Sequence, residues 1–259
     1  MMPGRRGFGN LRSPEAGSTV LGVASDDTER ELYRIGGIAG IASGVVAIVG
    51  NALHPRSGAG DLGDLEAQLQ MIADFSLWKI DHLLIVLALV LGLPAFVALA
   101  RSLWDGPSGV WARFALPTAF ATGAVALVAF SIDGFVLGEV AEDWASSGAS
   151  DAALLERAST LRYLDLGLFS VAIIGLFGVT QVLYGLALQR SAAYPGWVGT
   201  VALMGGVAGL ASGVWMWMAG GLETGNFLVL FTISSVLLAV WLLYASVLLV
   251  RRAAATPAV

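Results

Sequence analysis

Long runs of apolar residues alternate with short polar segments along this chain. The runs cover about residues 35–53, 80–100, 113–138, 163–188, 197–219 and 227–250, and each is near the ~20 residues that an α-helix needs to cross the hydrocarbon core of a bilayer. Stretches such as LLIVLALVLGL lack the alternation of apolar and polar positions that a membrane-spanning β-strand requires. The pattern therefore predicts an all-α, polytopic membrane bundle of six transmembrane helices.

The segments outside these runs are expected to be tails and outer loops. Residues 1–33 lack the apolar core of a signal peptide, so we expect a flexible cytoplasmic tail, with a helix that begins near residue 27 and runs into the first span. The six-span domain then covers residues 34–252, and residues 253–259 form a C-terminal tail. Of the outer segments, residues 61–75 predict an amphipathic helix and residues 151–161 a second short helix. Together these two helices are expected to cover the outer ends of the bundle.

Composition agrees with a membrane protein and excludes several kinds of site. Hydrophobic residues make up 57% of the chain and charged residues only 13%, about half the charged share of a typical soluble domain. The chain has no cysteine, which excludes disulfides, thiolate zinc sites and iron–sulfur clusters. A net charge of −5 gives no basic footprint for nucleic acid, so the expected surroundings are the lipid bilayer, and no nucleic-acid partner is expected.

The distribution of charge predicts the orientation. If the N-terminus is inside, the outer segments carry 13 of the 19 acidic residues, whereas the inner segments hold ten of the 14 basic ones. Short loops rich in arginine face the cytoplasm, so both termini are expected to be cytoplasmic. The inner basic residues are Arg5, Arg6, Arg12, Arg30, Arg34, Arg101, Arg113, Arg190, Arg251 and Arg252.

Tryptophans are expected to form two belts at the membrane surfaces, because their amphipathic rings favour the interface. This orientation puts one group at the inner surface and the other near the outer surface. The inner group is Trp104, Trp111 and Trp197, and the outer group is Trp78, Trp215 and Trp217.

A glycine pattern occurs in both the first and the fifth span. GGIAGIASGV begins at Gly36 and GGVAGLASGV begins at Gly205, and the two agree at eight of ten positions. Glycines four residues apart form a flat helix face that another backbone can approach closely. The repeat is explained either by an internal duplication or by convergence on one packing solution. In both cases we expect helix contacts at Gly36, Gly40, Gly44, Gly205, Gly209 and Gly213.

Polar side chains gather where the spans reach the outer surface. The centres of the spans lack charge, and the two histidines of the chain belong to the outer layer. Ionisable groups at membrane depth indicate function by default, and here they form an outer polar cluster. A relay across the whole membrane is unsupported, because the centres of the spans lack charge. The cluster consists of Asn51, His54, Lys79, Asp81, His82, Asp133, Arg162, Asp165, Glu223 and Asn226.

Several interpretations of this cluster stay open. His54 and His82 are candidate metal ligands, with Asp81 or Asp133 completing the shell, because imidazole and carboxylate suit zinc or manganese. A metal-bound water with Asp133 as general base would support hydrolysis. The same two imidazoles are also candidate axial ligands of a haem.

Each of these residues is also a candidate for a purely structural role. Each histidine is also typical of an interfacial residue at a helix end. Arg162 and Asp165, three residues apart on one helix, are expected to form an ion pair. Asp133 lies deeper in the membrane than the others, so it needs a partner on another helix or a bound ligand.

The motif set resembles one group of bacterial membrane proteins. LHP (Leu53 to Pro55), Trp-x3-His (Trp78 to His82) and PGWVG (Pro195 to Gly199) resemble motifs of six-helix integral membrane proteins from GC-rich bacteria, a domain family of unknown function. The resemblance covers about residues 34–250. It implies a six-span fold in a prokaryotic cytoplasmic (inner) membrane and directs attention to His54 and His82, but it implies no activity.

Three functions remain. The chain favours a non-enzymatic small-molecule or lipid-binding, sensing or accessory subunit with an outward-facing polar vestibule, because no residue pattern specifies chemistry. The second is a metal- or haem-binding protein, with hydrolase or redox chemistry at His54 and His82. The third is a passive or secondary transporter, suggested by the repeated glycine pattern. Glycine faces also suit contacts in a homo-oligomer or in a larger membrane complex.

Overall fold

The computed structural model describes residues 18–55, 64–219 and 225–255, and within these ranges all regular secondary structure is helical. The predicted all-α bundle is therefore confirmed. Six helices in the described part are long and apolar enough to cross a membrane, so the chain is a multi-pass membrane protein. They are Asp27–Leu53, Trp78–Ser102, Gly106–Ser146, Ala152–Gln189, Gly196–Ala219 and Leu228–Ala255.

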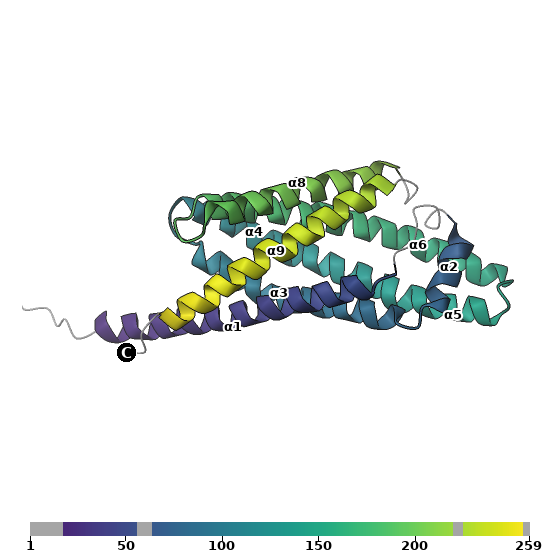
Figure 1. Cartoon of the computed structure of the whole chain (residues 1–259), viewed down its shortest axis with the longest axis horizontal. Helices are drawn as coiled ribbons and strands as arrows, with labels where there is room; N and C mark the ends of the chain where they lie inside the picture. Colours follow the sequence, from purple (N-terminus) through teal and green to yellow (C-terminus); the bar gives the residue numbers. More distant parts are fainter. Residues whose placement is uncertain (1–17, 56–63, 220–224, 256–259) are drawn as a thin grey trace, which may run out of the picture.

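Figure 1 shows an elongated bundle in which most helices run lengthwise. Four spans lie in the single helices α1 (Ser18–Leu53), α3 (Trp78–Ser102), α8 (Gly196–Ala219) and α9 (Gly225–Ala255). In each of the other two, a π-helix joins two α-helices: α4 (Gly106–Ser131), η2 (Ile132–Leu137) and α5 (Gly138–Ser146) form one, and α6 (Ala152–Ala172), η3 (Ile173–Thr180) and α7 (Gln181–Gln189) form the other. Along the chain, the short helix α2 (Leu65–Asp74) follows α1 and precedes α3.

Helix α1 begins earlier than the sequence predicts. It starts at Ser18 and not near residue 27, so residues 18–33 of the expected flexible tail are helical. This segment contains Leu, Ala, Glu and Arg and no proline, all of which favour a helix even where the apolar run has not begun. The rest of the predicted tails, residues 1–17 and 256–259, lies outside the described residues.

The third and fourth spans also extend beyond their predicted ends. Gly106–Ser146 has 41 residues, which corresponds to ~60 Å of helix, about twice the thickness of a hydrocarbon core. The outer helix expected at residues 151–161 is thus the beginning of α6, with the Asp151 side chain accepting hydrogen bonds from the first turn. The expected outer helix at residues 61–75 is present as α2, and its residues 61–63 lie outside the described part.

The protruding ends of these helices form a cap with α2 at one end of the bundle. We define the cap as α2, α5 and the first turns of α6, which lie together in Figure 1. Together with Trp78 of α3, their apolar side chains form a cluster separate from the main core of the bundle. It consists of Leu69, Ile72, Trp78, Val140, Ala141, Trp144 and Ala158.

The two ends of the bundle differ in charge. The capped end, which we call the acid-rich end, carries among its described residues Lys79, Arg157 and Arg162 against Asp64, Glu66, Asp74, Asp81, Asp133, Glu139, Glu142, Asp143, Asp151, Glu156 and Asp165. The opposite, arginine-rich end carries Arg30, Arg34, Arg101, Arg113, Arg190, Arg251 and Arg252 against Asp27, Glu29, Glu31 and Asp105.

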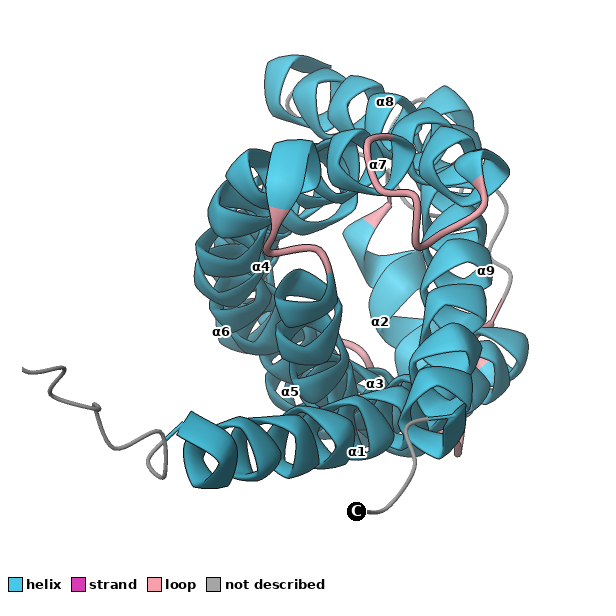
Figure 2. Cartoon of the chain, turned by 90° about the vertical axis from the view of Figure 1, so that its left-hand side faces the viewer, coloured by secondary structure: helices cyan, strands magenta, loops and turns pink. Residues whose placement is uncertain are grey.

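Viewed along the bundle, the helices follow one another around its axis, with α1 and α3 opposite α8, and α4 with α6 opposite α9 (Figure 2). Both glycine faces pack against neighbouring helices. A Cβ atom on Gly40 would overlap Ser246 of α9 and lie 2.8 Å from Ala95 of α3, and one on Gly209 would overlap the Phe177 carbonyl and lie 2.8 Å from Ser234 of α9. The other four glycines of the two faces also have close neighbours: Gly36 faces Ala98 and Pro94, Gly44 faces Leu243, Gly205 faces Gln181 and Leu237, and Gly213 faces Ile174.

Candidate functional site

Four ionisable side chains from three different elements meet at the acid-rich end. His54 follows the end of α1, Asp81 and His82 lie in the first turns of α3, and Asp133 lies in η2. His54 Nδ1 is 3.0 Å from Asp81 Oδ2, His82 Nδ1 is 2.7 Å from Asp81 Oδ1, and His82 Nε2 is 3.0 Å from Asp133 Oδ2. We call these four residues the His/Asp cluster. It contains both histidines and two of the carboxylates that the sequence places in the outer polar layer.

The centre of the cluster is buried and its edge is open. The side chains of Asp81 and His82 are 0% and 2% exposed, whereas those of Asp133 and His54 are 26% and 39% exposed. His82 Nδ1 also lies 2.8 Å from the Trp78 carbonyl, one turn earlier in α3. Both nitrogens of the buried ring therefore have oxygen partners, as buried polar groups require, and His54 provides the exposed face.

Close packing of η2 on α3 holds the His82 ring. A Cβ atom on Gly134 would overlap the Cβ of His82 and lie 2.6 Å from its Cγ, so only glycine permits this approach. A π-helix includes one more residue in its turn than an α-helix, and such turns often occur at functional sites. Here the π-helix η2 presents Asp133 and Gly134 to α3, which supplies the interhelical partner that the depth of Asp133 requires.

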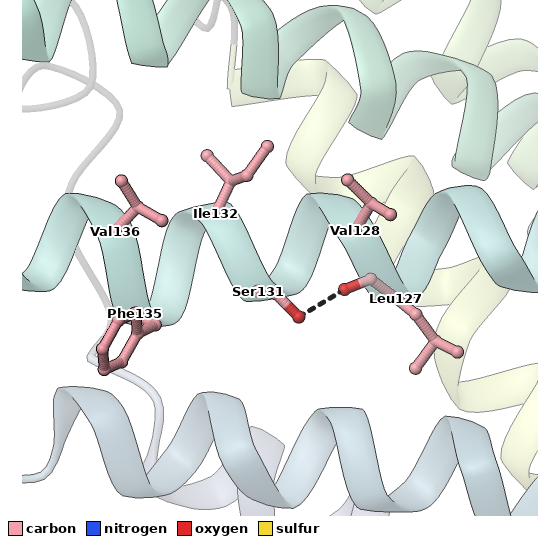
Figure 3. A pocket seen from close by; sticks show the side chains of 6 residues that line it. All are labelled: Leu127, Val128, Ser131, Ile132, Phe135 and Val136. Atoms are coloured by element: carbon pink, nitrogen blue, oxygen red, sulfur yellow. Dashed lines mark hydrogen bonds between the residues drawn. The ribbon is translucent and has the colours of Figure 1, made fainter.

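Part of η2 also borders an apolar stretch of the surface. Figure 3 shows a shallow surface groove lined along α4 and η2 by six side chains, with Ser131 donating a hydrogen bond to the Leu127 carbonyl. Val128 and Phe135 are exposed there. Within η2, Asp133 thus contacts His82 of the cluster, while Phe135 is exposed at the groove.

Trp78 is part of the site and not of an interfacial belt. Its side chain is buried, its ring centroid is 4.3 Å from that of His82, and its Nε1 donates to the Asp133 carbonyl at 3.1 Å. The sequence prediction of an outer interfacial anchor is therefore wrong for Trp78, because the cap covers this turn of α3. The four-residue spacing to His82 was the available signal for a direct contact.

Asp165 lies near the cluster. It interacts electrostatically with Asp133 and His82, and its Oδ1 atom is buried with no hydrogen-bond partner in the described part of the chain. Helix α6 thus brings this carboxylate close to η2 and α3. The ion pair expected between Arg162 and Asp165 stays a prediction.

Asn51 does not join the cluster. Its side chain is exposed and donates to the Ala47 carbonyl of its own helix at 2.8 Å. Lys79, in contrast, pairs with Glu139 and Glu142 at 2.7 and 2.9 Å, and so connects the first turn of α3 to the cap.

Three members of the cluster have the geometry of a metal site. One ligand atom each from His54, Asp81 and His82 can be chosen so that all three lie within 4.8 Å of one another. Two ligands of a tetrahedral zinc ion, each about 2.0 Å from the metal, are roughly 3.3 Å apart. Binding an ion here would bring the three atoms closer together and would replace the contact of His82 Nδ1 with the Trp78 carbonyl by a bond to the metal.

A haem does not fit between the two histidines. Their ring centroids are 5.2 Å apart in an edge-to-face contact, and Trp78 packs against both rings. A porphyrin would have to lie between the imidazoles, where the rings already touch and where Gly134 closes the other side of His82. The prediction that these residues are axial haem ligands is therefore not supported.

Comparison of the chain with protein-family models, with curated proteins and with solved structures finds no match.

Proposed function

We propose that this protein is a multi-pass membrane protein that binds a divalent metal ion, zinc by preference, at the acid-rich end of its bundle. The observation that carries the proposal is the convergence of His54, Asp81 and His82 within 4.8 Å. Two imidazoles and one carboxylate are a common ligand set for zinc, and a set of three protein ligands leaves a fourth position open.

Asp133 would act as a positioning residue for the metal. Metal-bound histidines usually donate their second ring N–H to a carboxylate, which fixes the tautomer and the orientation of the ring. His82 has this arrangement, because its Nε2 lies 3.0 Å from Asp133 Oδ2 while its Nδ1 faces Asp81. Asp133 is thus committed to His82, which argues against its service as the general base of a hydrolase.

The surroundings of the cluster favour capture of a cation from solution. Acidic side chains outnumber basic ones at this end, and a surface of one sign raises the local concentration of opposite ions. His54, the most exposed member, lies where such an ion would arrive. A role in binding or sensing is supported by this arrangement, because the site combines an open ligand position with an acidic surface that attracts cations.

The test is calorimetric titration of the detergent-purified protein with Zn²⁺. We expect about one equivalent to bind, and we expect His54→Gln and Asp81→Asn to weaken binding more than about tenfold, because each removes a ligand. The matched control is Asp143→Asn, which removes an exposed carboxylate of the cap. His54→Gln is preferred to changes at His82 because the His54 side chain is 39% exposed, whereas that of His82 is almost fully buried.

Two results would overturn the metal proposal. One is the absence of stoichiometric binding to a wild-type protein that melts cooperatively. The other is equal Zn²⁺ affinity in wild type, His54→Gln and Asp81→Asn. Substitution with Co²⁺, whose absorption reports its coordination geometry, gives a second readout on the same samples.

The proposal includes the orientation of the protein in the membrane and the kind of membrane that contains it. The excess of arginine at the end opposite the cluster supports cytoplasmic termini, so that the metal site would face outward. The resemblance of the LHP and Trp-x3-His motifs to bacterial six-helix proteins supports a prokaryotic cytoplasmic membrane.

A further inference from the structure

A shallow apolar groove lies on the outside of the bundle in its arginine-rich half, far from the His/Asp cluster. Helices α1, α3 and α4 form it together. Its walls are apolar and partly open, since Ile35 is 52%, Val90 46% and Phe120 43% exposed. The lining residues used below are Leu32, Ile35, Val90, Leu93, Val97 and Phe120.

Two arginines stand where this groove opens toward the end of the bundle. Arg101 follows Val97 by four residues on α3, and Arg113 precedes Phe120 by seven residues on α4. Because steps of four and seven return to the same face of an α-helix, each arginine continues the line of a groove residue toward the arginine-rich end.

The guanidinium groups of both arginines keep hydrogen-bond donors available. Arg113 stacks over the Trp104 ring at 5.0 Å and makes no hydrogen bond within the described ranges. Arg101 pairs through Nε with Glu29 Oε1 at 3.2 Å, and its side chain is 47% exposed. Stacking orients a guanidinium plane and leaves its edge for an anion. Glu29 balances Arg101, so Arg113 supplies the net positive charge.

We propose that the groove binds one anionic phospholipid. An acyl chain lies along Leu93, Val97 and Phe120, and the phosphate lies between Arg101 and Arg113. The location favours a lipid, because basic sites between membrane helices bind anionic headgroups and this one continues directly into an apolar groove. The site is independent of the proposed metal function, since it shares no residue with the His/Asp cluster.

The test measures phosphatidylglycerol binding to the detergent-purified protein by native mass spectrometry, with phosphatidylcholine and inorganic phosphate as the other two ligands. We expect the double variant Arg101→Gln/Arg113→Gln to weaken phosphatidylglycerol binding about tenfold or more. The matched control is Arg190→Gln. Arg190 stacks on Trp111 at 5.1 Å at the same end, but it directly follows α7, which does not line the groove.

A second pair of variants tests the acyl-chain part of the site. Ile35→Trp fills the groove and is expected to reduce phosphatidylglycerol binding about as strongly as the double arginine variant. Ile38→Trp places the same ring on an exposed position of α1 outside the groove, and it is expected to bind like wild type. Neither change replaces a buried side chain, so both proteins are expected to fold.

Selective binding of phosphatidylglycerol that is lost in Arg101→Gln/Arg113→Gln and Ile35→Trp but kept in both controls supports the proposal. Equal binding of phosphatidylcholine, or an equal loss in Arg190→Gln, would show a general effect of charge and overturn it. Displacement of the lipid by inorganic phosphate at equal concentration would make the site a phosphate site and also overturn it.

Discussion

At the scale of single residues, His82 is the side chain on which the His/Asp cluster depends. It is almost fully buried, its two nitrogens face Asp81 and Asp133, and its ring lies between Trp78 and the backbone of Gly134. A ring held on every side adopts one orientation, and a ligand that is already oriented loses little entropy when it binds a metal.

Removing the charge of Asp133 tests this orientation. We expect Asp133→Asn to weaken Zn²⁺ binding about 10- to 100-fold, the usual cost of losing the carboxylate that supports a metal-bound histidine. The measurement is a competition titration with a chelator of known affinity, and Asp143→Asn is the control. Unchanged affinity in Asp133→Asn would show that the contact with His82 has no part in metal binding.

Part of this site can be predicted from the sequence, and part of it cannot. The topology of the spans places His54 and His82 at one end although they are far apart in the chain, and the depth of Asp133 indicates a buried partner. The burial of Trp78 depends on packing between the cap and α3, and the position of Gly134 depends on a π-helix. Neither the packing nor the π-helix has a signature in hydropathy, so neither could be predicted.

At the scale of elements, close backbone contacts at glycines hold the spans together. Gly40 and Gly209, at equivalent places in the repeated pattern, each face a serine of α9, Ser246 and Ser234 respectively. Lipid tails are as apolar as the helices, so membrane helices associate mainly through close packing of small residues and not through a hydrophobic effect. The equivalence of the two contacts is compatible with both an internal duplication and convergence on one packing solution.

Larger side chains at these glycines are expected to destabilise the bundle. Gly40→Leu and Gly209→Leu each force neighbouring helices apart, at a cost of at least about 1–3 kcal/mol, and should lower the melting temperature in detergent. Gly167→Leu is the control, because a Cβ at Gly167 has no neighbour within 4 Å. A melting temperature unchanged by all three substitutions would mean that the glycine faces are not tight contacts.

Hydropathy predicts where a helix crosses the membrane but not where the helix ends. The apolar runs give the six spans correctly, yet α1 begins at Ser18 and α5 ends at Ser146. Residues such as Glu139 and Glu142 end an apolar run while remaining compatible with helix. Their side chains pair with Lys79, so the polar extension is stabilised by contacts that only the folded structure provides.

At the scale of the whole molecule, the described residues form two hydrophobic clusters, one in the bundle and one in the cap. The His/Asp cluster lies close to the boundary, since Trp78 belongs to the cap cluster and packs on His82. Stability need not be uniform across such a molecule, because each cluster can open separately.

Deleting a large side chain of the cap tests this division. Trp144→Ala should cost the cap about 3–5 kcal/mol, and hydrogen exchange should become faster in α2 and α5 while α8 and α9 keep their protection. Trp217→Ala, at an exposed position of α8, serves as the control and should change neither the stability of the cap nor the exchange rates of α2 and α5. Faster exchange in every helix of Trp144→Ala would show that cap and bundle unfold as one unit.

The position of α9 has a consequence for biosynthesis. It contacts both α1 and α8 through serines opposite glycines, yet it follows both in the chain and leaves the ribosome after them. All four members of the His/Asp cluster lie in the three spans that precede Ala152 or directly after one of them, and they are inserted well before α9. The cluster can therefore assemble during translation, whereas α1 and α8 must wait in the lipid for α9. A chain that stops before α9 would leave both glycine faces uncovered, a defect that membrane proteases and chaperones can recognise.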